Sequence, residues 1–340
     1  MIAVQNAHLL ITTATHAGMR GKNNEDRFGV FTYQRSADDP TPVVFAVLCD
    51  GVGGHSAGEV AAELAVESIR QAIATSTAEQ PLASLKQGIL SASQVILDRA
   101  GQDAERKGMG STCVCAWVIG DRLFTASVGD SRLYLLRNET IRQVTIDHTW
   151  VQEALEYGVL TPEQARKHPN QHVIRRYLGS QEPPQVDFRL KLNNAETDEQ
   201  AEANQGLRLQ PGDCLVLCSD GLSDLVTADE ILKAAQSEID APQALVRLAN
   251  ERGGHDNITV ILLKVPTPSE AKTVFTLPSN ARTQPQAEAP TVIARPEERA
   301  PSSPAVQLTA EHRNQRLFAI SCLVLIIVLA LLVWVLIRII

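Results

Sequence analysis

Five aspartates stand where apolar runs of this sequence begin or end, and a charge in such a place needs a partner. Asp50 closes the run VVFAVLCD, and Asp130 closes ASVGD. Asp220 closes LVLCSD, Asp256 stands just before ITVILLKV, and Asp26 precedes an early run in KNNEDRFGV. A buried carboxylate without a partner is costly. One such aspartate is usually only a turn residue, but five around a shared core indicate a common function.

A divalent cation would remove the repulsion among these carboxylates, because clustered carboxylates raise one another's pKa. The candidate ligands are all oxygens, with no cluster of His or Cys, so Mg²⁺ or Mn²⁺ fits better than Zn²⁺. Gly51 lets the backbone approach an ion, and its carbonyl oxygen is a further candidate ligand. Two such ions can activate a water and clamp a phosphoryl oxygen. Metal-assisted hydrolysis of a phosphate ester is therefore the leading chemistry.

The elements that must position these residues are short apolar strands and paired helices. The predicted strands cover residues 43–50, 111–119, 122–130, 132–137, 213–220 and 258–265. The predicted helices cover residues 57–74, 81–99, 228–237 and 242–252, with Ser56 as a candidate N-cap of the first. Gly120-Asp121 and Asn138-Glu139 are hairpin turn signals. Regular alternation of strand and helix is missing, which favours antiparallel sheets covered by helices.

Composition and motifs exclude several other classes of protein. The chain has 340 residues and a net charge of −8, which argues against nucleic-acid binding, because that needs Lys and Arg to neutralise phosphates. None of the six cysteines forms a Cys-x-x-Cys pair, which favours buried free thiols in a reducing compartment over a zinc site. The kinase motifs H-R-D and D-F-G are absent, and so is a phosphate-binding P-loop.

Residues 317–337, LFAISCLVLIIVLALLVWVLI, form an apolar run without a charge. At about 1.5 Å per residue it just spans the roughly 30 Å hydrocarbon core, so we expect a C-terminal transmembrane helix. Arg313 and Arg316 precede it and the N-terminus does not resemble a signal peptide, so we expect the preceding domain in the cytoplasm, at the cytoplasmic membrane. Residues 267–311, rich in Pro, Ala, Thr, Ser, Gln and Glu, are predicted to be a disordered linker.

Seven segments occur in an order typical of one family. They are GMRGKNNEDRFGV, LCDGVGGHSAGEVAA, GMGSTCVCAWV, ASVGDSRLYLLR, DHTWVQEALEYGVLTPEQARKHPNQHVIRRYLG, LVLCSDGLSDLV and GGHDNITVILL. Together they resemble the PPM-type, metal-dependent protein Ser/Thr phosphatases, the protein phosphatase 2C family, in their bacterial form. The resemblance covers nearly all of residues 12–265.

The resemblance implies an α+β fold, a four-layer α-β-β-α sandwich of two antiparallel sheets flanked by helices, over residues 5–266. It also implies a site for two Mg²⁺ or Mn²⁺ ions, with a weaker third position, and a flap at about residues 147–180 that helps to choose substrates. The family's metal ligands match Asp26, Asp50, the Gly51 carbonyl, Asp220 and Asp256, with Asp130 and Asp220 at the third position. In the implied mechanism Asp50 bridges both ions, and a water between them attacks phosphorus.

Two positions depart from the family's pattern. The family's phosphate-binding arginine would align with Gly21, so Arg20 is the candidate and Lys22 the competitor. Val52 stands where eukaryotic members have a histidine proposed as general acid; His55 and a metal-bound water are the alternatives.

The expected function is dephosphorylation of Ser/Thr-phosphorylated proteins, with a membrane Ser/Thr kinase as the expected counterpart. The alternatives are a catalytically silent sensor or scaffold of the same fold, and a hydrolase of small phosphoesters. Presence of all five aspartates favours an enzyme.

Overall fold

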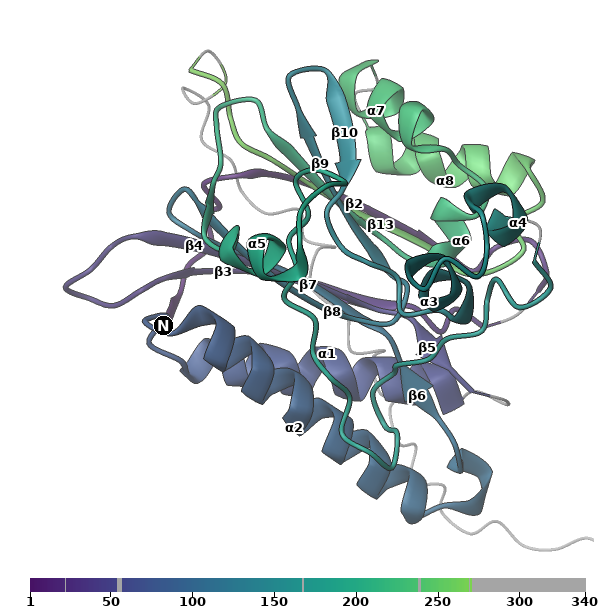
Figure 1. Cartoon of the computed structure of the whole chain (residues 1–340). Coiled ribbons are helices and arrows are strands. Elements are labelled where there is room, and N and C mark those ends of the chain that lie inside the picture. The colour runs from purple at the N-terminus through teal and green to yellow at the C-terminus, as the bar shows by residue number, and fades with distance from the viewer. Residues whose placement is uncertain (22, 54–56, 167, 238–239, 269, 271–340) are drawn as a thin grey trace, which may run out of the picture. The chain divides into compact units, whose positions relative to one another are not determined.

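The computed structural model describes residues 1–270, apart from 22, 54–56, 167, 238–239 and 269 (Figure 1). The chain divides into two compact units, Met1–Gln286 and Ala287–Ile340, and every described residue lies in the first. In this described part, no helix is long and apolar enough to cross a membrane. The predicted transmembrane helix at 317–337 and nearly all of the predicted linker at 267–311 lie outside the described residues.

Two antiparallel sheets form the centre of the domain (Figure 1). The first has the spatial order β1 (Ile2–Ala3), β3 (Arg27–Gln34), β4 (Pro42–Cys49), β7 (Cys113–Ile119), β8 (Arg122–Val128) and β11 (Leu207–Arg208). The second has the order β10 (Thr140–Gln143), β9 (Arg132–Arg137), β12 (Cys214–Cys218), β13 (Ile258–Lys264) and β2 (Leu10–His16). A separate pair joins β5 (Gly51–Val52) to β6 (Gly110–Ser111). Neighbouring strands pair antiparallel throughout.

Helices cover the outer face of each sheet (Figure 1). The first sheet is covered by α1 (Ala57–Thr75) and α2 (Pro81–Gly101), and the second by α7 (Ala228–Ser237) and α8 (Ala241–Glu251). The short elements are η1 (Ala104–Arg106), α3 (Trp150–Glu156), α4 (Pro162–Arg166), α5 (Asp198–Ala203) and α6 (Asp220–Ser223).

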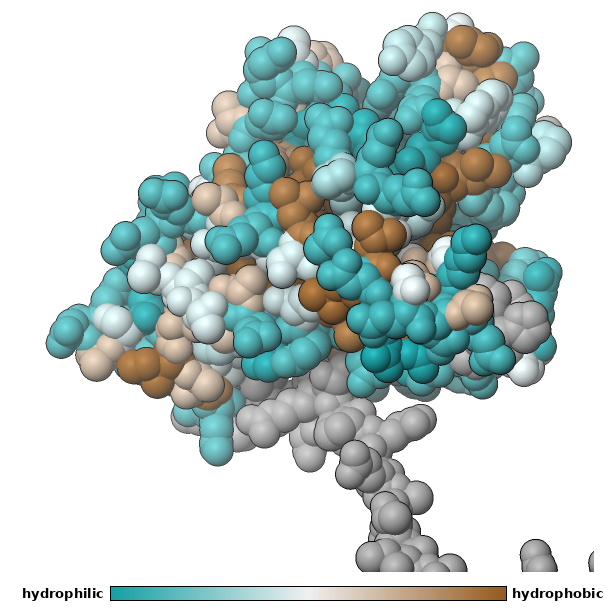
Figure 2. Space-filling model, turned by 90° about the horizontal axis from the view of Figure 1, so that it is seen from below, coloured by the Kyte–Doolittle hydropathy of each residue, from teal (hydrophilic) through white to brown (hydrophobic). Residues whose placement is uncertain are grey.

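The side chains of β4 show why the sequence forms layers. Val44 and Leu48 belong to the apolar cluster between the two sheets, whereas Phe45 and Val47 belong to the cluster between the first sheet and its helices. Successive residues of a strand point to opposite faces, so a strand that is apolar at every position must be covered on both. The molecular face in Figure 2 is mostly hydrophilic with small apolar patches, as expected when both sheets are covered. The predicted four-layer sandwich is confirmed.

The predicted strands and helices are present, and so are both hairpin turns. However, the strand predicted at 213–220 ends at Cys218, with Asp220 beginning α6, and the strand predicted at 111–119 is divided between β6 and β7. Gly120 has a φ of 60°, and Asn138 and Glu139 have φ of 50° and 61°. In the Asn138-Glu139 turn, positive φ at both central residues matches the tight turns that suit the twist of a hairpin.

Some elements were not predicted. Strand β2 has the sequence LITTATH, in which threonines break the apolar pattern. The flap helices α3 and α4 are only 7 and 5 residues long, too short for a clear helical period. In α3 the start is set by Thr149, whose hydroxyl accepts a hydrogen bond from the Gln152 N–H at 3.3 Å.

The described structure extends slightly past the predicted domain limits of 5 and 266. Strand β1 pairs with β3 through Ile2 and Ala3. At the other end Glu270 lies 2.8 Å from the Lys264 ammonium and accepts a hydrogen bond from the Thr267 hydroxyl at 2.8 Å. The candidate helix cap Ser56 lies outside the described residues.

Candidate metal centre

The fold brings the five predicted aspartates to one edge of the sandwich. Asp50 follows β4 and Asp130 follows β8, whereas Asp26 directly precedes β3. Asp220 follows β12 and Asp256 precedes β13. Because neighbouring strands are antiparallel, the end of one lies beside the beginning of the next. Five positions spread over 231 residues of chain can therefore share one site.

The charges of all four other aspartates act on Asp50. Burial raises the pKa of Asp50 well above its ordinary value, and the carboxylates of Asp26, Asp220, Asp130 and Asp256 raise it further. All four other aspartates are thus close enough to oppose its ionisation.

Two other aspartates of the group, Asp26 and Asp130, also have raised pKa values. The pKa of Asp26 is raised to about 6 and that of Asp130 to about 7, and burial is the largest cause in both. Oδ1 of Asp26 and Oδ1 of Asp130 are buried and accept no hydrogen bond from a described residue. Buried anionic oxygens without donors fit a hard divalent cation. Asp26, Asp50, Asp220 and Asp256 would hold such ions, with Asp130 beside them.

Two residues that the sequence did not single out fix the backbone at Asp50. The Thr112 hydroxyl accepts a hydrogen bond from the Asp50 N–H at 2.9 Å, and the Thr112 N–H donates to the Asp50 carbonyl at 2.8 Å. The Ser111 hydroxyl donates to the same carbonyl at 3.1 Å. Thr112 also hydrogen-bonds the Ser131 hydroxyl at 2.7 Å, so it links the loops that carry Asp50 and Asp130.

Asn257 and Ser219 hold the loop that carries Asp26. The Asn257 side chain accepts from the Glu25 N–H at 2.7 Å and donates to the Ala17 carbonyl at 3.1 Å. The Ser219 hydroxyl donates to Oδ2 of Asp26 at 2.8 Å. The only sequence signal for either residue is that each adjoins a predicted ligand, Asp256 or Asp220.

Gly51 lies where no side chain fits. A Cβ on Gly51 would stand 2.1 Å from the Gly58 carbonyl oxygen and 2.8 Å from that of Glu25, both backbone atoms. We expect Gly51→Ala to lower the free energy of unfolding by about 1–3 kcal/mol, as overpacking does, in urea unfolding without metal. Gly101→Ala, with nothing within 4 Å of its new Cβ, is the matched control and should be nearly neutral. Equal stabilities of the two variants would contradict the close fit.

His148, which the sequence analysis did not assign, supports the turn before Asp130. Its Nδ1 accepts a hydrogen bond from the Gly129 N–H at 2.9 Å, so its Nε2 carries the proton and donates it to Asp187 at 3.0 Å. The His148 N–H also donates to the Gly129 carbonyl at 3.0 Å. His148 therefore positions Asp130 from the base of the flap.

Replacing His148 with leucine should loosen this turn. We expect a loss of about 1–3 kcal/mol in unfolding free energy, the cost of unpaired buried polar groups, and a higher Mn²⁺ concentration for half-maximal activity. His168→Leu removes an imidazole that stacks on Trp150 with ring centroids 4.6 Å apart, and should leave the Mn²⁺ requirement unchanged. A normal Mn²⁺ requirement in His148→Leu would make His148 purely structural.

The candidate phosphate-binding residues lie at the rim of the centre. Arg20 is exposed and forms no ion pair with a described residue. It follows Met19, whose N–H donates to the Gly254 carbonyl at 2.8 Å, two residues before Asp256. Lys22 and His55 lie outside the described residues. Val52 is exposed in the short strand β5 that begins at Gly51.

The predicted flap contains α3 and α4 and borders a cavity of about 790 Å³. Its base is closed by hydrogen bonds from the Trp150 N–H to the Val173 carbonyl at 2.9 Å and from the Arg175 N–H to the His148 carbonyl at 2.7 Å. The polar cavity lining outside the flap includes Arg132, Gln143, Ser223, Asp224 and Thr227. The flap and the metal centre thus share one side of the domain.

A family model described as protein phosphatase 2C matches residues 14–256. The chain belongs to the protein phosphatase 2C family. Its relatives include the serine/threonine phosphatase stp of Listeria welshimeri, 35% identical over 257 residues, with 74% of this chain and 93% of the relative covered. Protein phosphatase PhpP of Streptococcus pneumoniae is 32% identical over 261 residues, with 75% and 97% covered.

Solved structures agree with this assignment. The Mycobacterium tuberculosis serine/threonine phosphatase PstP/Ppp superposes with a TM-score of 0.62 at 31% identity, covering 76% of this chain and 99% of that one. The catalytic domain of PstP in complex with two manganese ions gives a TM-score of 0.59 at 31% identity, with 75% and 97% covered. The predicted enzyme class of this protein phosphatase 2C chain, a protein serine/threonine phosphatase, and its predicted cofactor, Mg²⁺ or Mn²⁺, are confirmed.

Proposed function

We propose that this chain removes phosphate from phosphoserine and phosphothreonine of cytoplasmic proteins at a two-metal centre held by Asp26, Asp50, the Gly51 carbonyl, Asp220 and Asp256. The observation that carries the proposal is the convergence of four carboxylates on that of Asp50, two of which, Asp26 and Asp130, have a buried oxygen that accepts no hydrogen bond from a described residue. When bound, the ions supply Lewis acidity for activating water and for neutralising phosphoryl charge.

The protein's own groups would orient the substrate. Arg20, exposed beside the loop that leads to Asp256, would bind the phosphoryl oxygens, with Lys22 as the competing donor. A guanidinium suits this role because it offers paired donors that match phosphate geometry. Asp50, whose backbone is fixed by Ser111 and Thr112, would be one of the carboxylates that hold the ions.

The flap cavity favours protein substrates over small phosphoesters. At about 790 Å³ it lies in the size range of sites that enclose sizeable ligands. A small phosphoester would need only the metal centre and Arg20. The side chains beside a phosphorylated residue could enter the cavity, which gives the enzyme a means of choosing among proteins.

We also propose that residues 317–337 anchor the enzyme in the cytoplasmic membrane and that 267–311 tether it. The support is the sequence alone: an uncharged apolar run follows a segment whose composition is typical of linkers. A flexible tether of this length would reach on the order of 35–40 Å. It would raise the effective concentration of the enzyme toward membrane-bound proteins, a Ser/Thr kinase among them.

The anchor can be tested by carbonate extraction of membranes from cells that express the full chain. Ile327→Arg with Ala330→Arg should release the protein into the soluble fraction, because each arginine costs about 2.5–3.5 kcal/mol at a helix centre. Ile340→Arg, which adds a charge beyond the apolar run, should stay in the membrane. Full extraction of the unmodified chain would overturn the anchor and leave the phosphatase proposal untouched.

The activity test uses the full chain with p-nitrophenyl phosphate and a phosphothreonine peptide, in Mn²⁺, in Mg²⁺ and in EDTA. We expect metal-dependent turnover of the peptide that EDTA abolishes and that Asp220→Asn lacks. A folded protein without turnover in either metal would favour the silent-module alternative. Turnover of the small ester with no peptide hydrolysis would favour the small-phosphoester alternative.

A further inference from the structure

The cavity beside the flap combines an apolar lining with a few charged groups. Its volume is about 790 Å³. The apolar lining residues come from α3, α4 and the chain around the start of α7: Val151, Leu155, Pro162, Ala165, Val226 and Ala228. The charged lining residues are Arg132, Asp147, His172 and Asp224. Such a lining suits a long amphipathic side chain, since lysine and arginine bury their aliphatic stems while their charged ends stay near polar groups.

Two of the four charged residues neutralise each other. The Arg132 guanidinium donates to the Asp147 carboxylate through three hydrogen bonds of 2.6–3.1 Å, and to the Tyr134 hydroxyl at 3.2 Å. The Asp147 carboxylate also accepts a hydrogen bond from the Gln143 side chain at 2.7 Å. Arg132 is therefore already engaged and does not offer the cavity a free positive charge, and Asp147 does not offer it a free negative one.

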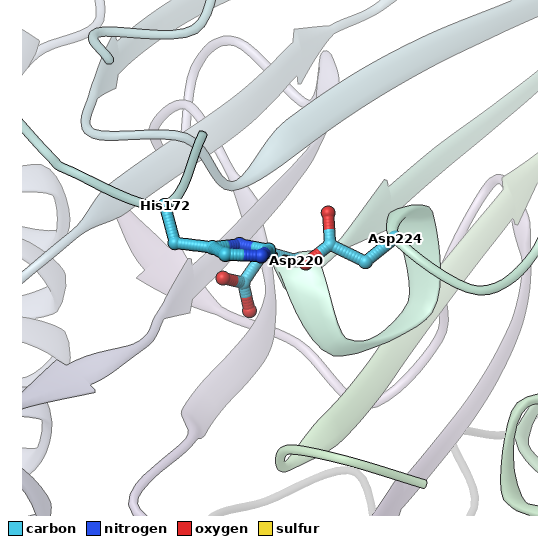
Figure 3. A group of neighbouring side chains, drawn as sticks. All are labelled: His172, Asp220 and Asp224. Carbon is cyan, nitrogen blue, oxygen red and sulfur yellow. Dashed lines mark ion pairs between the residues drawn. The ribbon is translucent and has the colours of Figure 1, made fainter. Parts of the chain in front are cut away.

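Asp224 keeps a negative charge that its surroundings do not fully neutralise. Its side chain is 37% exposed, and Oδ2 lies 3.1 Å from Nδ1 of His172, as Figure 3 shows. No other described side chain forms a hydrogen bond or ion pair with this carboxylate. His172 is itself 55% exposed, and a histidine carries only part of a positive charge near neutral pH. The cavity therefore presents a net negative charge at Asp224.

Asp224 also lies close to the place where phosphate would be hydrolysed. It is the C-cap of α6, which begins at the proposed metal ligand Asp220, and its N–H donates to the Asp220 carbonyl at 2.8 Å. One oxygen of its carboxylate lies within 4.8 Å of an oxygen of the Asp220 carboxylate. An extended peptide advances about 3.3 Å per residue. A residue one or two positions from the phosphorylated one can therefore place a long side chain in the cavity.

We propose that this cavity is a subsite for a lysine or arginine side chain of the substrate, within two positions of the phosphorylated residue, and that Asp224 pairs with its charged end. The inference rests on the proposed function, because the subsite is defined relative to the metal centre. The apolar lining would contact the methylene stem of the side chain. An acidic side chain at the same position would be repelled by Asp224, because Arg132 is already held by Asp147.

The test uses pairs of phosphothreonine peptides in which one neighbouring residue is either arginine or citrulline, its uncharged isostere. The variable residue is placed in turn at each of the two positions before and after the phosphothreonine. With the full chain in Mn²⁺, we expect kcat/KM to be about five- to tenfold higher for the arginine peptide in at least one placement. This effect lies between those of an exposed ion pair and of a hydrogen bond to a charged group. It should appear in KM, because the contact is made in substrate and transition state alike.

Asp224→Asn should remove the preference for the arginine peptide. Asp229→Asn is the matched control: it removes the same charge from an exposed residue that does not line the cavity, so it should keep the preference. Each ratio compares two peptides with one enzyme, so a lower overall activity of a variant does not affect it. Equal kcat/KM for both peptides in every placement, or a preference that Asp224→Asn retains, would overturn the subsite.

A binding measurement separates this inference from the proposed function. Fluorescence anisotropy with peptides that carry a phosphonate in place of the phosphate gives Kd in Mn²⁺ without hydrolysis. Tighter binding of the arginine peptide by a chain that shows no turnover would keep the subsite and refute the catalytic proposal. Turnover of the phosphothreonine peptides without any preference for arginine would refute only the subsite.

Discussion

Asp50→Asn should lower the turnover of a phosphothreonine peptide at saturating Mn²⁺ by at least about a thousandfold. Asp50 is the carboxylate on which the charges of all four other aspartates act, so it lies among all the groups that would hold the ions. Asparagine keeps the shape of the side chain but supplies no charge to an ion. Removing a single hydrogen-bond donor that stabilises a transition state lowers kcat by up to about a thousandfold. Because Asp50 would hold two ions, its replacement should cost at least as much. The measurement is kcat at several Mn²⁺ concentrations.

The stability of the variant distinguishes loss of chemistry from loss of folding. Without metal, Asp50→Asn should unfold at an equal or higher temperature than the unmodified chain, because it removes a carboxyl group whose ionisation its surroundings and its neighbours oppose. Asp38→Asn changes an exposed carboxylate and should alter neither activity nor stability. Substantial turnover in Asp50→Asn would show that the ions are held without it and would refute the proposed centre.

The metal-free protein should lose stability as the pH rises from about 5 to 7.5, and Mn²⁺ should restore it. The pKa is about 6 for Asp26 and about 7 for Asp130 in the folded chain, and both are near 3.9 in an unfolded chain. In this window the unfolded chain has released these protons, whereas the folded chain still holds part of them. The free energy of unfolding therefore falls as the pH rises. Each shift is worth on the order of 3–4 kcal/mol.

Most other shifted carboxyl groups do not disturb this window. The pKa of Glu230 and that of Glu270 are lowered to about 2, by hydrogen bonds from Arg252 and Lys264 respectively, so their stabilisation is complete above about pH 5. Burial lowers the pKa of His8, which by itself makes the folded chain more stable as the pH rises. This effect opposes that of Asp26 and Asp130, but it comes from one group only.

Urea unfolding at pH 5, 6 and 7.5, with EDTA and with Mn²⁺, measures the effect. The gain from Mn²⁺ should be larger at pH 7.5 than at pH 5, and Asp130→Asn should flatten the metal-free profile. A metal-free stability that stays level or rises with pH would contradict the assigned burial of these carboxylates.

The sequence by itself determined the layers and the candidate ligands, because both depend on local patterns. A strand such as β4, apolar at every position from Val43 to Cys49, must be covered on both faces. Asp50 and Asp220 stand where such strands stop, so their place at the edge of the sheets follows from the boundary of the apolar run. The hairpin at Asn138 and Glu139 was likewise predictable from residues that favour a tight turn.

Only the tertiary structure decided which polar residues support these ligands. Asn257 holds the backbone of Glu25, 232 positions away, and Thr112 holds that of Asp50. No periodic pattern marks such residues, since a hydrogen bond between loops depends on how two sheets stack.

The same holds for the histidines. His148 and His172 look alike in the sequence, both lying in the flap, yet one is 4% exposed and supports Gly129, while the other faces solvent beside Asp224. Their surroundings come from chain segments that meet only after the sheets are packed. A side chain's type fixes what chemistry it can do, but its burial and its partners decide which chemistry it does.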